Sequence, residues 1–397
     1  MSDRGVLIVG GGLAAQRCAE TLRRRGYEGT VRMVCAESDP PYDRPPLSKE
    51  LLAGSAEEDS VAYRPVWWYE ETEIELLLGT RAEALDPATR TVRLDSGTEL
   101  GYGQLLIATG SAARELPFLR GFGNVHSLRT LADARRLREE LTPGAHLAIV
   151  GAGFIGQEVA ATARRLGLEV TMIEALETPL APILGAELGS WFAELHRDEG
   201  VRVLTGAMLE SARGRAGRLE ELVLADGERI ACDAVVVGVG TAPATAWLAG
   251  SGLDEKGVRT DTAGRTALPG VFTAGDASVP FDPRFGNHAR TEHWDAAAWQ
   301  GAAVAKAMLG EYPGTPPLPS FWSDQYGLRI QYVGHAHHAD GVEIEGDPAG
   351  RDFTATFRRG ETPIAGLAVG RPRAIPALKK QIENGHFPAK DRELEAA

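Results

Sequence analysis

The first hydrophobic run of the chain is short and ends in three glycines. Residues 5–9 read GVLIV, glycines occupy positions 10–12, and the following residues carry apolar side chains at helical spacing until Gly26. A second, β-branched run at 30–34 leads to Glu37. An apolar run, a helical period and another apolar run are typical of successive strand, helix and strand, so we predict a βαβ unit over this stretch.

The same pattern returns in the middle of the chain. An apolar run at 146–150 is followed by Gly151-Ala152-Gly153, by helical spacing up to Leu166, and by a run at 169–173 that leads to Glu174. The second copy begins 141 residues after the first, measured from Gly10 to Gly151. Because each such unit builds one nucleotide site, the repeat predicts two dinucleotide-binding units.

The rest of the pattern indicates more buried strands and a small terminal domain. Apolar runs at 105–110, 234–240 and 271–276 end in turn residues and are predicted to be buried strands. Residues 313–320 hold four prolines in eight positions, which is typical of a linker. Beyond it, short runs between 328 and 370 alternate like a β meander, and a short helix is expected near 374–382. We therefore predict an α/β protein with two Rossmann-like domains and a small α+β domain at its C-terminal end.

Composition narrows the classes of protein. Glycine accounts for 47 of the 397 residues, which is more than the usual share of about 7%. The 43% of hydrophobic residues and the lack of a G-X-Y repeat exclude a disordered or collagen-like chain and indicate a packed globular one. The net charge of −13 argues against nucleic acid or an anionic membrane as the main partner. No apolar run approaches the length of a membrane span, and three cysteines without a CxxC motif favour a reduced compartment, so a cytoplasmic protein is expected.

The first glycine loop fits the fingerprint of a dinucleotide site. Gly10-x-Gly12-x-x-Ala15 supplies a tight turn, a position where backbone N–H groups approach a pyrophosphate, and a small residue for close helix packing. Glu37, 27 positions after Gly10, is placed to accept hydrogen bonds from ribose hydroxyls. A generic turn is the alternative, but the strand, the helix and the acid in sequence favour a nucleotide site.

The second glycine loop fits the fingerprint more fully. Gly151-x-Gly153-x-x-Gly156 has a glycine in all three roles, and Glu174 follows 23 positions after Gly151. A carboxylate here binds the ribose 2′-hydroxyl of NAD and repels the 2′-phosphate of NADP. The loop therefore predicts NADH in preference to NADPH, and two nucleotides on one chain predict a redox enzyme.

Seven motifs in the same order resemble the FAD-dependent, NADH-using ferredoxin reductases of the putidaredoxin reductase type. These enzymes serve bacterial cytochrome P450s and Rieske-type dioxygenases. The resemblance covers essentially the whole chain. Its motifs are PPYDRPPLSK (40–49), LLIATGS (105–111), SLRTLADA (127–134), GAGFIGQEVA (151–160), TAGDAS (273–278), RTEHWDAA (290–297) and FWSDQYG (321–327).

The resemblance implies a glutathione-reductase-like arrangement with defined domains and site residues. Residues 1–112 with 245–319 would bind FAD, 113–244 would bind NADH, and 320–397 would form the C-terminal α+β domain. The cofactor-binding positions that it implies, together with the two fingerprints, are Gly10, Gly12, Leu13, Ala14, Ala15, Glu37, Arg44, Lys49, Ala82, Thr109, Gly110, Arg129, Gly151, Gly153, Phe154, Ile155, Gly156, Glu158, Glu174, Gly238, Gly240, Gly275, Asp276, Glu292, His293 and Trp294.

Four residues are implied to act in electron transfer. Lys49 would lie near flavin N5, Glu158 near both the nicotinamide and Lys49, and Trp294 and Trp322 at the flavin. On the residues alone, plainer alternatives stay open. Lys49 is also typical of a solvated helix terminus, Glu158 of a first-turn acid favoured by the helix dipole, and each Trp of core packing.

The resemblance also implies the electron acceptor. NADH would reduce FAD, and electrons would pass singly to a [2Fe–2S] ferredoxin that serves a P450 or a Rieske oxygenase. The segment RPRAIPALKK at 371–380 has four bases and no acid, which suits an acidic ferredoxin, although a solvated helix face explains it equally. The oligomeric state, monomer or dimer, stays open.

Two other functions fit the same sequence. An NADH oxidase or a small-molecule or quinone reductase would use the same cofactors, and a flavin-binding redox sensor would turn over slowly. Cys35 lies within a predicted strand as a buried, inert thiol, which disfavours disulfide reduction. His335, His337 and His338 lack a further spaced ligand, so no metal site is expected.

Overall fold

The first βαβ unit is part of a five-stranded parallel sheet. The computed structural model describes residues 4–284 and 286–385, and its first sheet has the strand order β19-β7-β1-β2-β3. Both faces of this sheet are covered, which explains the continuous hydrophobic runs seen in the sequence. The strands are β1 (Val6–Val9), β2 (Val31–Val34), β3 (Ile74–Leu77), β7 (Gln104–Ile107) and β19 (Val271–Thr273).

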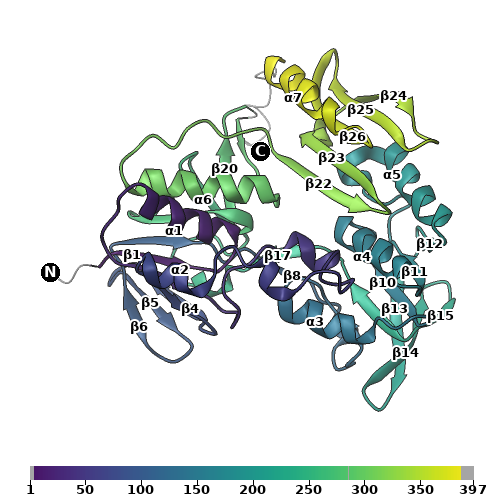
Figure 1. The fold of residues 1–397 in the computed structure, drawn as a ribbon, viewed down its shortest axis with the longest axis horizontal. Coiled ribbons are helices and arrows are strands. Elements are labelled where there is room, and N and C mark those ends of the chain that lie inside the picture. The colour runs from purple at the N-terminus through teal and green to yellow at the C-terminus, as the bar shows by residue number, and fades with distance from the viewer. Residues whose placement is uncertain (1–3, 285, 386–397) are drawn as a thin grey trace.

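Two helices far apart in the sequence cover one face of this sheet. They are α1 (Leu13–Arg24) and α6 (Trp294–Met308), which lie side by side at the left of Figure 1 and share one apolar core with the strands. On the other face, a small antiparallel sheet packs against Leu7 and Leu105. Its strands are β4 (Ala82–Asp86), β5 (Thr91–Leu94) and β6 (Glu99–Gly101). A short helix, α2 (Val66–Glu71), precedes β3.

The second βαβ unit builds a separate five-stranded parallel sheet, in the order β12-β11-β10-β16-β9. Helices α3 (Leu131–Glu140) and α4 (Phe154–Arg165) flank it. The strands are β9 (Val125–His126), β10 (His146–Val150), β11 (Glu169–Ile173), β12 (Arg202–Leu204) and β16 (Ala234–Val237). An antiparallel sheet of β13 (Leu209–Arg215), β14 (Arg218–Leu224) and β15 (Arg229–Ala231) covers the other face.

A two-stranded ribbon joins the two units. Strands β8 (Ser111–Ala113) and β17 (Thr241–Pro243) pair antiparallel where the chain enters and leaves the second unit. The expected boundaries near residues 112 and 244 fall at this ribbon, although the boundaries themselves stay a prediction. A further small sheet, of β18 (Val258–Thr260), β20 (Ser278–Asp282) and β21 (Asn287–His288), precedes α6.

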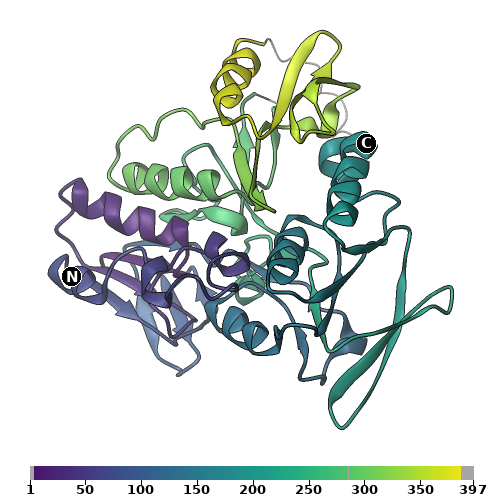
Figure 2. The same cartoon turned by 45° about the vertical axis from the view of Figure 1, so that its right-hand side comes forward.

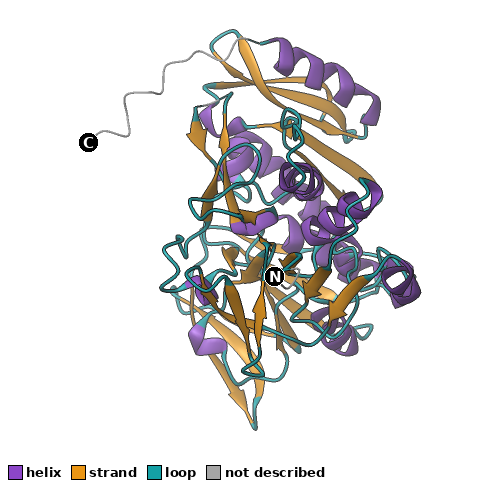
Figure 3. Ribbon diagram, turned by 90° about the vertical axis from the view of Figure 1, so that its left-hand side faces the viewer, coloured by secondary structure: helices purple, strands orange, loops and turns teal. Residues whose placement is uncertain are grey.

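The C-terminal region forms an antiparallel sheet between two helices. Its strand order is β22-β23-β26-β25-β24. Helix α7 (Ile375–Asn384) lies across its outer face (Figure 3), and α5 (Ala181–Asp198) reaches the inner face from the second unit (Figure 2). The strands are β22 (Ser320–Gln325), β23 (Leu328–Gly334), β24 (Gly341–Asp347), β25 (Asp352–Arg359) and β26 (Thr362–Val369).

The predicted fold class is confirmed, with additions. The expected meander and terminal helix are present, but strand β22 was not predicted, because its sequence SFWSDQ mixes polar and aromatic residues. Residues 386–397 of the predicted third domain lie outside the described residues. Over the described ranges, 4–284 and 286–385, we find no helix both long and apolar enough to cross a membrane.

Candidate functional site

The two glycine loops open onto one cavity of about 800 Å³ that lies between the two units. This volume is at the upper end of the range of about 300–1,000 Å³ usual for ligand pockets. All but three of the predicted site residues line it. The exceptions are Ala15, which is fully buried in α1, Gly151, and Glu174.

The first glycine loop has the geometry that its fingerprint predicts. Gly10 has a φ of +131°, and a Cβ at this position would lie 2.1 Å from the carbonyl oxygen of Ala108. Gly12 is the N-cap of α1 with no side-chain cap, and a Cβ there would meet nothing within 4 Å. The N-terminal N–H groups of a twelve-residue helix therefore face open space, which suits a pyrophosphate.

The second glycine loop repeats this geometry. Gly151 has a φ of +98° with Gly238 O only 2.4 Å from a Cβ position, and Gly153 caps α4 beside open space. Gly156 is needed for close packing, because a Cβ there would lie 2.4 Å from Gly151 O. Glu174 lies just outside the cavity, where its carboxylate accepts hydrogen bonds from the backbone N–H groups of Ala152 (2.8 Å) and Leu176 (2.9 Å).

Glu37 is held differently from Glu174. Its Oε1 accepts a hydrogen bond from the Arg44 guanidinium at 2.7 Å, and its Oε2 accepts one from the Tyr42 hydroxyl. Burial raises the pKa of Tyr42, so the phenol keeps its proton and donates. Glu37 is thus a charge-compensated carboxylate on the wall of the cavity.

Lys49 and Glu158 form a buried ion pair. Lys49 Nζ lies 2.6 Å from Glu158 Oε2, and the two side chains are 11% and 5% exposed. The Ser48 hydroxyl donates to the same oxygen at 2.5 Å, and the Ser323 hydroxyl donates to Oε1 at 2.7 Å. The solvated lysine and the first-turn acid, which the sequence left open, do not describe these two residues, because both side chains are largely buried and Glu158 is the fifth residue of α4.

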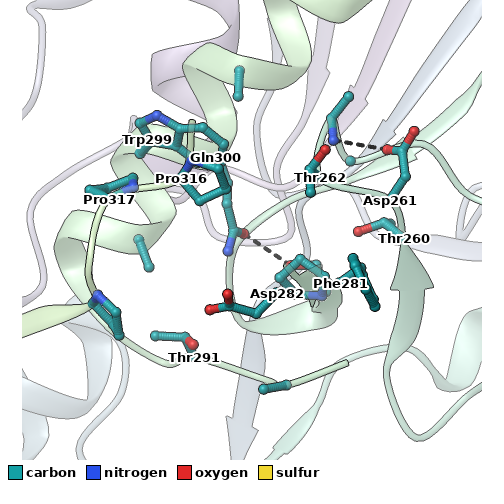
Figure 4. Close-up of a pocket in the computed structure, with 18 of the residues that line it drawn as sticks. Thr260, Asp261, Thr262, Phe281, Asp282, Thr291, Trp299, Gln300, Pro316 and Pro317 are labelled. Atoms are coloured by element: carbon teal, nitrogen blue, oxygen red, sulfur yellow. Dashed lines mark hydrogen bonds between the residues drawn. The ribbon is translucent and has the colours of Figure 1, made fainter. Parts of the chain in front are cut away.

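Asp276 closes the cavity at the carboxyl end of the first sheet. Its Oδ2 accepts hydrogen bonds from Arg129 at 2.6 Å and Ser111 at 2.8 Å. Gln300 of α6 holds the loop from behind, where its Oε1 accepts from Gly275 N (2.7 Å) and from the Ser278 hydroxyl (2.9 Å). Gln300 borders a second, small cavity of about 60 Å³ beside Trp299 and Asp282 (Figure 4). Asp276 is therefore fixed on both sides.

Aromatic side chains form another wall of the cavity. Trp294 and Trp322 meet with ring centroids 5.8 Å apart, and the Trp294 indole donates to Asp43 Oδ1 at 2.7 Å. The Arg329 guanidinium lies 5.1 Å from the ring centroid of Trp322. Both tryptophans are only partly buried and line the cavity, so core packing alone does not account for them.

His293 and Glu292 precede Trp294 on the same wall. Burial lowers the pKa of His293 to about 4, so its ring is neutral at neutral pH. Glu292 accepts a hydrogen bond from Thr241 at 2.8 Å and pairs with Arg290, which ties this segment to the ribbon between the units.

Several residues that contact the predicted site residues were not themselves predicted from the sequence. Ser48, Tyr42 and Asp43 lie inside a motif that the sequence singled out, so their proximity could have been inferred, but their partners could not. Ser323 also lies inside one of the seven motifs, but on strand β22, which was not predicted, and Arg329 lies on the predicted strand β23 and contacts Trp322 of β22. The site contacts of Ser48, Ser323 and Asp43 join residues 110 to 251 positions apart in the chain, a separation that no local pattern reports.

The cysteines take no part in the site. All three are buried free thiols, and none is among the residues that line the large cavity. Burial raises the pKa of Cys35 to about 12, so it stays protonated and unreactive. The described residues therefore offer no thiolate beside the cavity.

The chain belongs to the pyridine nucleotide-disulphide oxidoreductase family, which matches residues 4–301. A reductase C-terminal domain matches residues 320–396. Among similar proteins, the ferredoxin–NAD(+) reductase component of the anthranilate 1,2-dioxygenase system of Burkholderia cepacia is 39% identical over 391 residues, covering 98% of this chain and 96% of the relative. The corresponding component of the biphenyl dioxygenase system of Paraburkholderia xenovorans is 38% identical, covering 86% of this chain and 84% of the relative.

Solved structures of ferredoxin reductases share the fold of this chain. Putidaredoxin reductase in its covalent complex with putidaredoxin superposes with a TM-score of 0.93 at 31% identity, covering 96% of this chain and 93% of that one. The ferredoxin reductase of the CYP199A2 system from Rhodopseudomonas palustris gives 0.87 at 34% identity, with 92% and 91% covered. The resemblance inferred from the seven motifs is confirmed.

Proposed function

We propose that this protein is an NADH-dependent flavoprotein reductase that passes electrons from NADH through FAD to a [2Fe–2S] ferredoxin, which in turn serves a P450 or a Rieske-type oxygenase. The observation that carries the proposal is the single cavity onto which both glycine loops open, with the Lys49–Glu158 pair on its wall. Two nucleotides bound from opposite ends of one cavity would meet at this pair.

The residues of the first unit fit FAD. The open N-terminus of α1 at Gly12 suits a pyrophosphate, Glu37 a ribose, and Asp276 the hydroxyl groups of a ribityl chain. Thr109 Oγ1 is buried on the cavity wall with no partner among the described residues, which a ligand would satisfy. FAD, when bound, would supply a group that accepts a hydride, which carries two electrons, and that releases these electrons one at a time.

The residues of the second unit fit NADH. The N-terminus of α4 at Gly153 faces open space, and Phe154 and Ile155 border the cavity next to it. Glu174 has no cation paired with it in the described part of the chain, so its negative charge would repel a 2′-phosphate. Between the two units, Lys49 supplies positive charge and Glu158 holds its ammonium in place.

The ferredoxin would dock where the aromatic wall reaches the surface. Trp322 and Arg329 combine an aromatic edge with a cation, which suits an acidic partner. The basic segment at 371–380 leads into α7, which covers the outer face of the C-terminal sheet (Figure 3), and Arg371 is paired with Asp352, so the segment would add steering from a distance rather than contact at Trp322. A cytoplasmic location is part of the proposal and is supported by the three free thiols.

A reductase assay tests the function directly. The purified holoprotein should show flavin absorbance that bleaches with NADH, and NADH-driven cytochrome c reduction should rise at least tenfold when a [2Fe–2S] ferredoxin is added. Rapid reoxidation by air with no gain from ferredoxin would instead identify an NADH oxidase or small-molecule reductase. Slow turnover with every acceptor would identify a redox sensor.

A further inference from the structure

Strand β22 contacts both nucleotide units through its two faces. Side chains alternate along a strand, and here Phe321, Ser323 and Gln325 face α4, while Ser320 and Trp322 face α6. Phe321 packs on Phe154, with ring centroids 4.7 Å apart, and the Ser320 hydroxyl donates to Asp295 of α6. Ser323 is therefore directed to Glu158 of α4.

A chain of hydrogen bonds fixes which way the Ser323 hydroxyl points. The carbonyl oxygen of Ala152, in the second glycine loop, can only accept, so the Gln157 amide nitrogen donates to it at 2.9 Å. The Gln157 amide oxygen then accepts from Gln325 Nε2 at 3.2 Å. The same Gln325 nitrogen donates to Ser323 Oγ at 3.1 Å, which leaves the Ser323 proton for Glu158 Oε1 at 2.7 Å.

All members of this chain are removed from water. Gln157 and Ser323 are 0% exposed, Gln325 is 1% exposed and Glu158 is 4% exposed. Glu158 Oε2 is held by Lys49 and Ser48, whereas Ser323 is the partner of Oε1 among the described residues. A buried carboxylate is stable as an anion only with such donors.

We propose that Ser323, oriented by Gln325, is a positioning residue that holds the Glu158 carboxylate against Lys49 and thereby sets the charge presented to the flavin. This inference rests on the proposed function for the identity of the cofactor. Without the Ser323 donor, Glu158 Oε1 loses its anchor and the carboxylate can turn away from Lys49 Nζ, so the charge of Lys49 is less fully compensated. Because reduction adds negative charge to a flavin, uncompensated positive charge favours the reduced form.

The test is an equilibrium titration of the FAD-loaded protein against a redox dye, which requires neither NADH nor ferredoxin. Ser323→Ala should raise the ratio of reduced to oxidised flavin at a fixed potential by about three- to tenfold, the scale of one ordinary net hydrogen bond. Glu158→Gln should shift the ratio in the same direction and further. Gln325→Leu, which removes the donor to Gln157 Oε1 and frees the Ser323 hydroxyl to rotate but leaves it able to donate, should give a smaller shift of the same sign.

A double variant and two controls decide whether the effect passes through Glu158. Ser323→Ala should add nothing in a Glu158→Gln background, since the charge it supports is already gone. Ser323→Thr should keep the wild-type ratio. Ser320→Ala, which removes a hydroxyl from the opposite face of the same strand, should also leave the ratio unchanged.

The inference is overturned if Ser323→Ala leaves the dye equilibrium unchanged, or shifts it equally with and without the Glu158 carboxylate. If Ser323→Ala loses its flavin, Ser323→Cys, a weaker donor of similar size, takes its place and must raise the ratio. A wild-type protein that binds no flavin, or whose flavin NADH does not reduce, contradicts the proposed function instead. The dye equilibrium therefore tests the role of Ser323, and the NADH reaction separately tests the proposed function.

Discussion

The two glycine loops share one backbone geometry but hold their acids in opposite ways. Gly10 and Gly151 both have positive φ and both approach a carbonyl of a neighbouring strand within 2.4 Å of a Cβ position. Glu37 is paired with Arg44 on the cavity wall, whereas Glu174 is held by backbone N–H groups outside the cavity. The loops thus recognise the same pyrophosphate chemistry, while the acids present a compensated charge in one unit and a free charge in the other.

The two loops also differ in how far the rest of the chain covers them. The first loop is covered by α6 and by the Asp276 segment, which return to it from the far end of the chain. The second loop begins a helix whose Ile155 is 49% exposed. A covered site suits a cofactor that stays bound, and an open one suits a substrate that must leave after each turnover. Matched substitutions in the two loops test this division.

The largest effect is expected from alanine at the first residue of each loop. Gly10→Ala should reduce the flavin content to about a tenth of wild type or less, because the positive φ and the contact with Ala108 O cost about 2 kcal/mol or more. Gly151→Ala should keep its flavin and lose the NADH reaction. Flavin absorbance per protein and bleaching by NADH measure the two outcomes. A Gly151→Ala protein that loses flavin would contradict the division between the units.

A smaller effect is expected from reversing the free acid. Glu174→Arg should lower kcat/KM for NADH by about 10- to 100-fold, the scale of a lost hydrogen bond to a charged group, and raise it for NADPH. Steady-state kinetics with both nucleotides measures the change. The matched variant Glu37→Gln should lower flavin retention and leave the ratio of the two nucleotides as it was. An unaltered NADH preference in Glu174→Arg would remove Glu174 from nucleotide selection.

Exchanging the third residue of each fingerprint should have unequal effects. Gly156→Ala places a Cβ 2.4 Å from Gly151 O, so α4 must shift, and KM for NADH should rise about tenfold by an overpacking cost of 1–3 kcal/mol. Ala15→Gly should cost about 1 kcal/mol of stability with full flavin content. Denaturant unfolding and NADH kinetics on both variants check the pair. Equal effects on NADH would show that the two third positions are not specific to their units.

The smallest effect is expected on stability at acidic pH, through a histidine at the contact between the second unit and the C-terminal domain. His196 of α5 is 1% exposed and lies 2.7 Å from the Tyr326 hydroxyl, and burial lowers its pKa to about 4. An unfolded histidine takes up its proton near pH 6.5, so unfolding binds a proton between these values and stability falls as the pH falls from about 6.5 to 4.

Removing this histidine should make the protein less sensitive to acid. The loss of unfolding free energy between pH 7 and pH 5 should be about 1–2 kcal/mol smaller in His196→Phe than in wild type. Denaturant unfolding at the two pH values measures it. An identical loss in both proteins would show that His196 does not titrate on unfolding.

The sequence predicted the parts of the molecule that rest on local patterns. Both βαβ units, the glycine loops and the terminal meander follow from hydrophobic period and turn residues. Pairings across the chain were beyond such reasoning: Lys49 and Glu158 are 109 residues apart, and their solvated alternatives were as compatible with the local sequence. The contact of Ser323 was missed because the polar residues of SFWSDQ conceal strand β22, and Glu174 is not among the residues that line the cavity.

The ribbon of β8 and β17 makes the second unit an insertion with adjoining ends. Ala113 and Thr241 are paired across it, so the chain departs from the first unit and rejoins it at one place. A segment attached in this way can be exchanged as a cassette, since both junctions lie together and the first sheet is completed by strands outside the segment. Nucleotide preference could then be transplanted between reductases by a single swap that leaves the flavin unit intact.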